Sequence, residues 1–181
     1  MSFGIIFLII IVIIFTIFIL TNIIYNRYQD YIIRINEVES KIDETLRNKY
    51  DNILKINNII KDSIKTDKII VDDISKLKKE EKSSFEMDRI LTEAFTKVDF
   101  IKKQYDGLKK NDELNKLFYS IDDFDESLVA YKKYYNENIT KYNKLIRKFP
   151  YNLLGKILKY KEKTFFDGKD LNDENIKDFK L

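Results

Sequence analysis

The sequence contains no cysteine and no histidine, and it has only one proline and four glycines among 181 residues. Without cysteine there is no disulfide framework and no thiolate nucleophile. Without histidine the chain lacks the commonest general base and the commonest metal ligand. The few glycines form neither a phosphate-binding loop nor a dinucleotide-binding motif. So few helix-breaking residues in so long a chain predict an all-α fold.

The charges are nearly balanced, with 33 Lys and Arg residues against 30 Asp and Glu residues and a net charge of +3. This balance differs from that of a typical basic nucleic-acid-binding protein. We therefore expect no nucleic-acid partner.

The segment Phe3–Ile24 contains no charged side chain, and the first one in the chain is Arg27. As a helix, Phe3–Ile24 would be about 33 Å long, enough to cross the hydrocarbon layer of a bilayer. A cleaved signal peptide would have a basic start, a shorter apolar core and a small-residue cleavage site, and Phe3–Ile24 does not show this pattern. A core helix of a soluble domain would have a polar face, which this segment also lacks. We predict that residues 1–26 form an uncleaved transmembrane anchor in contact with lipid through residues 3–24. Tyr25, Tyr28 and Tyr31 follow it, as an interfacial aromatic belt would.

The basic residues near this segment all lie after it, at Arg27, Arg34 and Lys41. The positive-inside rule therefore predicts a single-pass protein of the cell membrane, with its N-terminus outside and its helical domain in the cytoplasm.

Apolar residues at helical spacing continue through the domain that we assign to residues 27–166. In the first stripe the spacing is three or four residues, apart from one gap of seven between Leu46 and Ile53. No Gly or Pro lies between Arg27 and Ile64, so this helix is expected to continue directly from the anchor. A second segment is expected to begin at Thr66-Asp67. Ser83 and Glu86 fit a capping box at the start of the next helix.

Asp106-Gly107 is expected to form a turn or a C-cap, and a last regular stripe runs from Leu117 to Phe149, where Pro150 should end the helix. These elements predict an antiparallel bundle of three to four helices with coiled-coil-like packing, whose first helix is the continuation of the anchor. Residues 167–181 have a polar composition and are expected to form a disordered tail.

Several short motifs in this pattern resemble the LemA family. They are Tyr135-Asn136, Tyr142-Asn143, Phe149-Pro150 and Phe165-Phe166, with Tyr25-Asn26, Arg34-Ile35, Ile42-Asp43 and Lys49-Tyr50-Asp51 upstream. The chain departs from the family pattern at Glu39, Leu54, Thr66-Asp67 and Asp106, so no role of a family histidine is carried over. The resemblance implies a bacterial single-pass membrane protein with a helical-bundle domain and no established reaction.

The Tyr-Asn pairs are expected to serve packing, with Tyr135 and Tyr142 in one seam against the first helix and their asparagines bonded across helices or to water. The alternative is a recognition face for a partner helix.

The acidic cluster Asp122-Asp123-Asp125-Glu126 lacks the glycine and the bidentate glutamate of a calcium-binding loop, so we expect a solvated helix face.

One group of apolar residues near the C-terminus is the candidate interaction patch: Leu153, Leu154, Ile157, Phe165 and Phe166. If the end of the bundle covers these residues, they close its core. If they are exposed, they offer a surface to a protein or to the membrane, and the nearby lysines at 156, 159, 161 and 163 suit anionic headgroups.

No converging set of catalytic residues is visible, so we expect no enzyme, no cofactor, no metal site and no small-molecule substrate. The predicted function is that of a membrane-anchored scaffold or adaptor, with protein partners or self-association through its helical faces. The first alternative is a protein that binds or remodels the membrane surface through the amphipathic C-terminal segment. The second is a regulator of a membrane enzyme.

Overall fold

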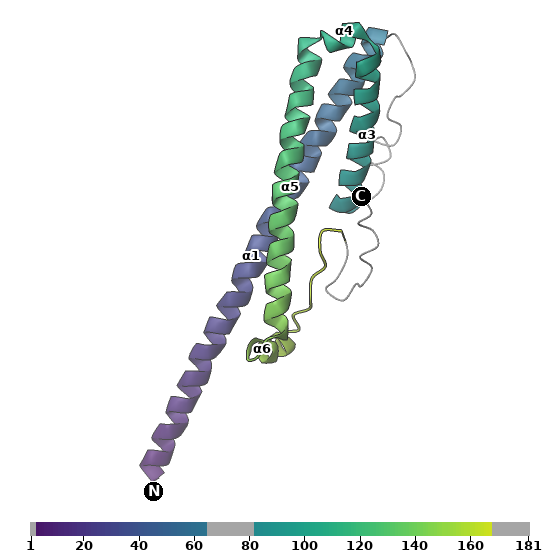
Figure 1. Cartoon of the computed structure of the whole chain (residues 1–181). Helices are drawn as coiled ribbons and strands as arrows, with labels where there is room; N and C mark the ends of the chain where they lie inside the picture. Colours follow the sequence, from purple (N-terminus) through teal and green to yellow (C-terminus); the bar gives the residue numbers. More distant parts are fainter. Residues whose placement is uncertain (1–2, 65–81, 168–181) are drawn as a thin grey trace. The chain divides into compact units, whose positions relative to one another are not determined.

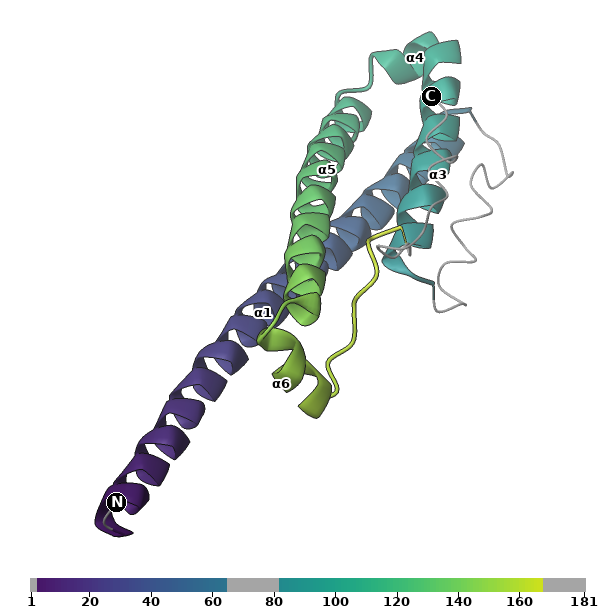
Figure 2. The same cartoon turned by 60° about the horizontal axis from the view of Figure 1, so that its bottom comes forward.

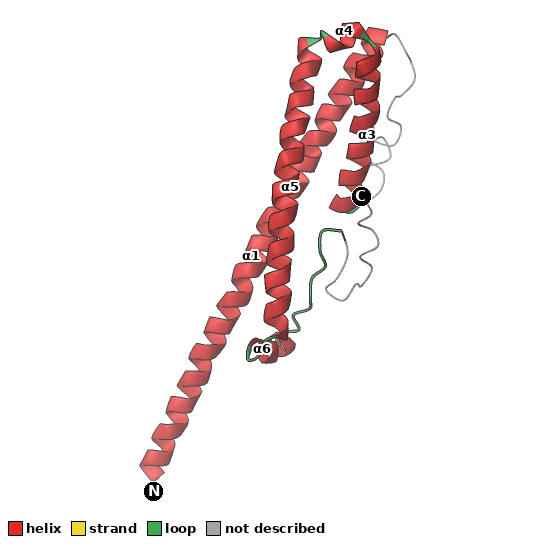
Figure 3. Ribbon diagram, viewed as in Figure 1, coloured by secondary structure: helices red, strands yellow, loops and turns green. Residues whose placement is uncertain are grey.

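A computed structural model of the chain describes residues 3–64 and 82–167 (Figure 1). The described part is helical and has no strand (Figure 3). Its helices are α1 (Phe3–Ile64), α3 (Ser84–Gln104), α4 (Asp106–Lys109), α5 (Asp112–Arg147) and α6 (Tyr151–Ile157). The predicted all-α fold is therefore confirmed. The segment expected to begin at Thr66-Asp67 lies outside the described residues, as does the predicted tail apart from Asp167.

Helix α1 is 62 residues long and has no break between the apolar segment and Ile64, as the sequence predicted. After Gly4 it contains neither glycine nor proline, so every later residue can donate or accept in the helical hydrogen-bond ladder. Residues 3–23 are exposed throughout, and α1 is long and apolar enough to cross a membrane. The Thr16 hydroxyl and the Asn22 side-chain NH₂ group donate to the carbonyl oxygens of Val12 and Phe18, so these two donors have partners within the helix.

The chain divides into two compact units. Unit 1 contains α1 as far as Glu37, α5 from Asn136, α6 and the segment that follows as far as Phe165. Unit 2 contains residues 38–135 together with Phe166.

Unit 2 is a three-helix bundle in which α1, α3 and α5 lie side by side (Figures 1 and 2). Its core consists of one apolar cluster drawn from these helices and from α4. The cluster includes Ile42, Leu46, Ile53, Ile56 and Ile60 of α1, Leu91 and Val98 of α3, Leu108 of α4, and Leu114, Ile121 and Leu128 of α5. The stripe of isoleucines predicted for the first helix is therefore the face of α1 that packs in the bundle.

Local capping fixes where the shorter elements begin. Ser83 is the N-cap of α3 and forms the expected capping box with Glu86. The side chain of Asn111 accepts a hydrogen bond from the backbone N–H of Leu114 at 2.9 Å and so caps α5. The residues between α3 and α5 do not form the expected turn. Asp106 and Gly107 begin the one-turn helix α4, because Leu108 is buried in the core, and the C-cap of α3 is Tyr105.

Candidate functional site

Helix α6 is held against α1 by a cluster of tyrosines in unit 1. Tyr28 of α1 is completely buried, and its ring centroid lies 4.9 Å from that of Tyr160, 6.0 Å from Tyr142 and 6.4 Å from Tyr151. Its hydroxyl donates a hydrogen bond to the backbone oxygen of Tyr151 at 3.0 Å. Tyr142 thus packs against the first helix as expected, and Tyr28 connects α1 with the end of α5, the start of α6 and the segment after it. The expectation that Tyr28 belongs to an interfacial aromatic belt is wrong, because its side chain is completely buried in unit 1.

The close approach of α6 to Tyr28 requires a residue without a side chain. A Cβ atom on Gly155 would lie 2.9 Å from the Tyr28 hydroxyl oxygen, which is closer than real contacts of this kind. Beyond Gly155 the helix ends in a Schellman motif, in which the N–H of Tyr160 bonds the oxygen of Gly155 at 2.9 Å. Lys159 occupies the left-handed position of this motif with a φ of 56°, where glycine is the usual residue.

Two tyrosines of this cluster, Tyr28 and Tyr142, have pKa values raised above the ordinary range. Burial, reinforced by Tyr28 and Tyr160, raises the pKa of Tyr142 to about 12. Burial also raises the pKa of Tyr28, with smaller contributions from Tyr160 and Tyr151. Groups that resist ionisation in this way are suited to packing, and they are poor proton donors near pH 7.

The segment after α6 is fixed to the end of α5 by side chains. The buried amide of Asn143 donates to the backbone oxygen of Lys163 at 2.7 Å and accepts from its N–H at 2.9 Å. Arg147 donates two hydrogen bonds to Glu162, at 2.6 and 2.7 Å, and this pairing holds the pKa of the Glu162 carboxyl below its usual value. Asn143 therefore serves packing as expected, but its partner is the backbone of an extended segment.

The five residues of the candidate interaction patch differ in burial and are divided between the two units. Phe166 belongs to unit 2, where it packs edge-to-face against Phe85 at 6.0 Å and Tyr135 at 6.4 Å. Leu154 and Phe165 are partly buried in unit 1. The other two residues of the patch are exposed: Leu153 by 54% and Ile157 by 74%.

Two further apolar side chains beside α6 are exposed, Phe149 by 72% and Leu158 by 38%. Phe149 was expected to be the last residue of the apolar stripe of α5, but α5 ends at Arg147 and Phe149 is exposed. Phe149, Leu153, Ile157 and Leu158 are hereafter called the α6 apolar surface.

A buried lysine in unit 2 is a feature that the sequence analysis missed. Lys49 of α1 is completely buried, and its ammonium lies 2.5 Å from Asp125 of α5 and 3.3 Å from the Thr92 hydroxyl of α3. Lys49 lies in the gap of the apolar stripe between Leu46 and Ile53, and it is also the first residue of the Lys49-Tyr50-Asp51 motif, but neither feature indicated that it would be buried. Asp122, Asp123 and Glu126 are exposed, as expected for a solvated face, and Asp125, whose side chain is 41% exposed, also pairs with Lys49.

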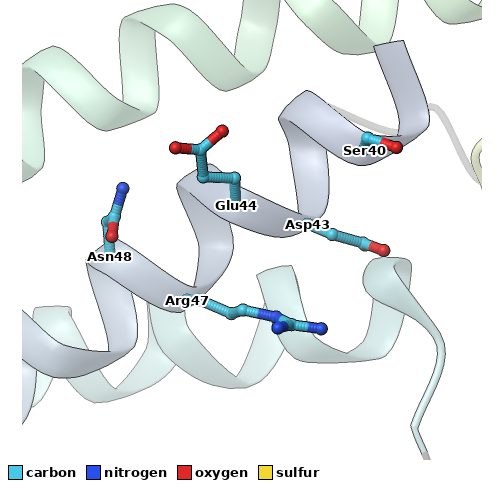
Figure 4. A pocket seen from close by; sticks show the side chains of 5 residues that line it. All are labelled: Ser40, Asp43, Glu44, Arg47 and Asn48. Carbon is cyan, nitrogen blue, oxygen red and sulfur yellow. The ribbon is translucent and has the colours of Figure 1, made fainter. Parts of the chain in front are cut away.

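A hollow of about 320 Å³ on unit 2 is lined by Ser40, Asp43, Glu44, Arg47 and Asn48 of α1. Figure 4 shows these five side chains. Glu44 and Asn48 extend to one side of the helix, and Arg47 and Asp43 extend to the other. Asp43 accepts a hydrogen bond from the Ser84 hydroxyl at 2.6 Å, so its carboxylate lies at the N-terminus of α3. Within residues 3–64 and 82–167 no group of three acidic side chains is placed to hold a metal ion. The hollow is therefore a polar surface of mixed charge.

These features define a class of protein in which one long helix begins as an apolar segment able to span a membrane and continues into a helical bundle. The LemA family model matches residues 38–178, which include the helical bundle. The protein belongs to the LemA family. The match begins at Val38, so the upstream motifs at Tyr25-Asn26 and Arg34-Ile35 lie outside it. Comparisons with curated proteins and with solved structures give no match.

Proposed function

We propose that this LemA family protein is a membrane-anchored, non-enzymatic scaffold whose bundle presents helical surfaces to protein partners or to further copies of itself. The observation that carries the proposal is the continuity of α1, which is at once the apolar segment and one of the three helices of the bundle. A single span at the cell membrane, with the bundle in the cytoplasm, follows from the basic residues after the apolar segment.

The outer surface of α5 offers two candidates for contact with a partner. Tyr119 is exposed by 71% and Val129 by 65%, although both side chains are large and apolar enough to favour burial. Exposed aromatic residues are also the residue type that protein interfaces use most. Asn143, by contrast, is buried and belongs to the packing of unit 1.

The scaffold proposal is tested with a photo-crosslinking residue placed at Tyr119 or Val129 of the full-length chain in cells. The matched control is the exposed Lys116, which lies one turn from Tyr119 on α5. We expect adducts of defined mass at Tyr119 and Val129 that are weaker or absent at Lys116. Equal, weak crosslinking at all three positions would overturn the proposal.

The orientation is tested separately, and the absence of cysteine makes the test simple because one introduced cysteine is the only thiol. A membrane-impermeant maleimide should label Tyr119→Cys only after the cells are opened. Labelling of intact cells would place the bundle outside.

A further inference from the structure

The α6 apolar surface is exposed in an element that the rest of unit 1 holds firmly in place. Leu153 and Ile157 are four residues apart and therefore share one face of α6. Gly155, which contacts Tyr28, lies on the opposite face. A seven-residue helix has little stability of its own, so the contacts of Tyr28, Asn143 and Arg147 determine its position.

The position of α6 along α1 puts it beside the end of the apolar segment. Tyr28 lies one helical turn beyond Ile24, which corresponds to about 6 Å along the helix axis. The headgroup layer on each side of a bilayer is also about 5–8 Å thick. Between α6 and the N-terminal end of α1, no other element of the described part of unit 1 lies beside α1 (Figures 1 and 2).

The charged side chains in the chain segment that contains α6 are all positive. From Lys148 to Lys161 the chain has no acidic residue, and its four lysines are exposed. They are Lys148, Lys156, Lys159 and Lys161. The nearest acidic residue along the chain, Glu162, is paired with Arg147. Apolar side chains surrounded by lysines are the composition of a surface that binds anionic lipid.

We propose that α6 is an interfacial contact of the protein with its own bilayer, in which Leu153 and Ile157 enter the boundary between headgroups and acyl chains. The lysines around them bind anionic headgroups. This inference is independent of the scaffold proposal and depends only on Phe3–Ile24 spanning the membrane. The position one turn from the span and the uniform positive charge favour lipid over a second copy of the chain, whose matching surface would carry the same charge.

The test uses the full-length chain in nanodiscs of phosphatidylcholine, with and without phosphatidylglycerol. An environment-sensitive fluorophore is attached at Ile157→Cys, and the lipid carries a quencher near the headgroup end of its acyl chains. The control is Tyr119→Cys, which is similarly exposed and lies about 42 Å from the end of α5 along the helix. We expect quenching at position 157, stronger with phosphatidylglycerol, and none at position 119.

Charge variants test the lipid preference separately. Lys156→Gln with Lys159→Gln should reduce the ratio of lipid-contacting to free label by about fivefold per lysine in phosphatidylglycerol nanodiscs. A label at position 157 that an aqueous quencher reaches as easily as it reaches position 119 would overturn the proposal. A label shielded from both quenchers would also overturn it, because protein would then cover the surface. Leu153→Cys repeats the measurement if Ile157→Cys disturbs folding.

Discussion

Removal of Asp125 should destabilise the bundle more than removal of Lys49, although the two residues form one ion pair. The Lys49 side chain is completely buried, whereas the Asp125 side chain is 41% exposed. Asp125→Ala leaves a buried ammonium that keeps, among the described residues, the Thr92 hydroxyl as its partner, while Lys49→Met leaves a carboxylate that water can reach. Lys49→Met also preserves most of the volume in the core.

The magnitudes follow from this asymmetry. Loss of one partner of a fully buried pair costs about 3–5 kcal/mol, and replacement of a buried charge by an apolar side chain of similar volume is often neutral. Because water screens the Asp125 end of the pair, we expect about 2–3 kcal/mol for Asp125→Ala. For Lys49→Met we expect a change within about 1 kcal/mol in either direction.

The assay is urea unfolding of the full-length chain in detergent micelles, followed by far-ultraviolet circular dichroism. The double variant should recover most of the stability that Asp125→Ala loses, because it no longer buries an unpaired charge. Arg89→Ala is the control, since the Arg89–Glu93 pair is exposed and 3.9 Å long, and its loss should cost less than about 0.5 kcal/mol. The reasoning fails if Lys49→Met costs as much as Asp125→Ala.

Three further predictions concern unit 1. Gly155→Ala should lower the free energy of unfolding by about 1–2 kcal/mol, measured in the same assay. The new Cβ would displace the Tyr28 hydroxyl, and the cost of this displacement exceeds the gain in helix propensity. Lys159→Gly should raise the free energy of unfolding by about 1 kcal/mol, because glycine adopts the positive φ without strain, and no gain in a denaturant titration would contradict this. Because the pKa of Tyr142 is about 12 in the folded chain, the contribution of Tyr142 to the free energy of unfolding should be constant below pH 10. That contribution should then fall by about 2.7 kcal/mol as only the unfolded chain loses the proton, and Tyr142→Phe should remove this part of the alkaline loss of stability.

The long helices and their packing faces could be predicted because they depend on local rules. An uninterrupted run of helix-compatible residues and a regular apolar stripe were enough to place α1 as far as Ile64 and to identify its core face. The capping box at Ser83 is equally local, since both of its hydrogen bonds lie within four residues.

Lys49 could not be predicted because its burial depends on partners from two other helices. In a sequence, one lysine in a gap of an apolar stripe is indistinguishable from a surface residue. Only the packing of α3 and α5 brings Thr92 and Asp125 within reach of its ammonium. The same argument applies to Asp125, whose neighbours in the sequence are exposed.

The segment after α6 could not be predicted either, because it is irregular and periodicity says nothing about irregular backbone. Phe165 and Phe166 are adjacent, yet they belong to different units. The path of the chain before them is set by the Asn143 amide, which bonds both backbone groups of Lys163. No spacing rule relates those two residues.

The strained position of Lys159 connects the stability of α6 with its proposed contact. A lysine at positive φ costs about 1 kcal/mol relative to glycine, and the backbone geometry of the motif would accept glycine directly. Lysine at this position also places a cation at the C-terminus of α6, where the helix dipole favours it, beside the α6 apolar surface. If the lipid contact exists, about 1 kcal/mol of attraction to an anionic headgroup offsets the strain. Lys159→Gly should therefore make the protein more stable in neutral detergent and at the same time weaken the quenching of a label at position 157 in phosphatidylglycerol nanodiscs. A stability gain without weaker quenching would show that the strain has no counterpart in lipid binding.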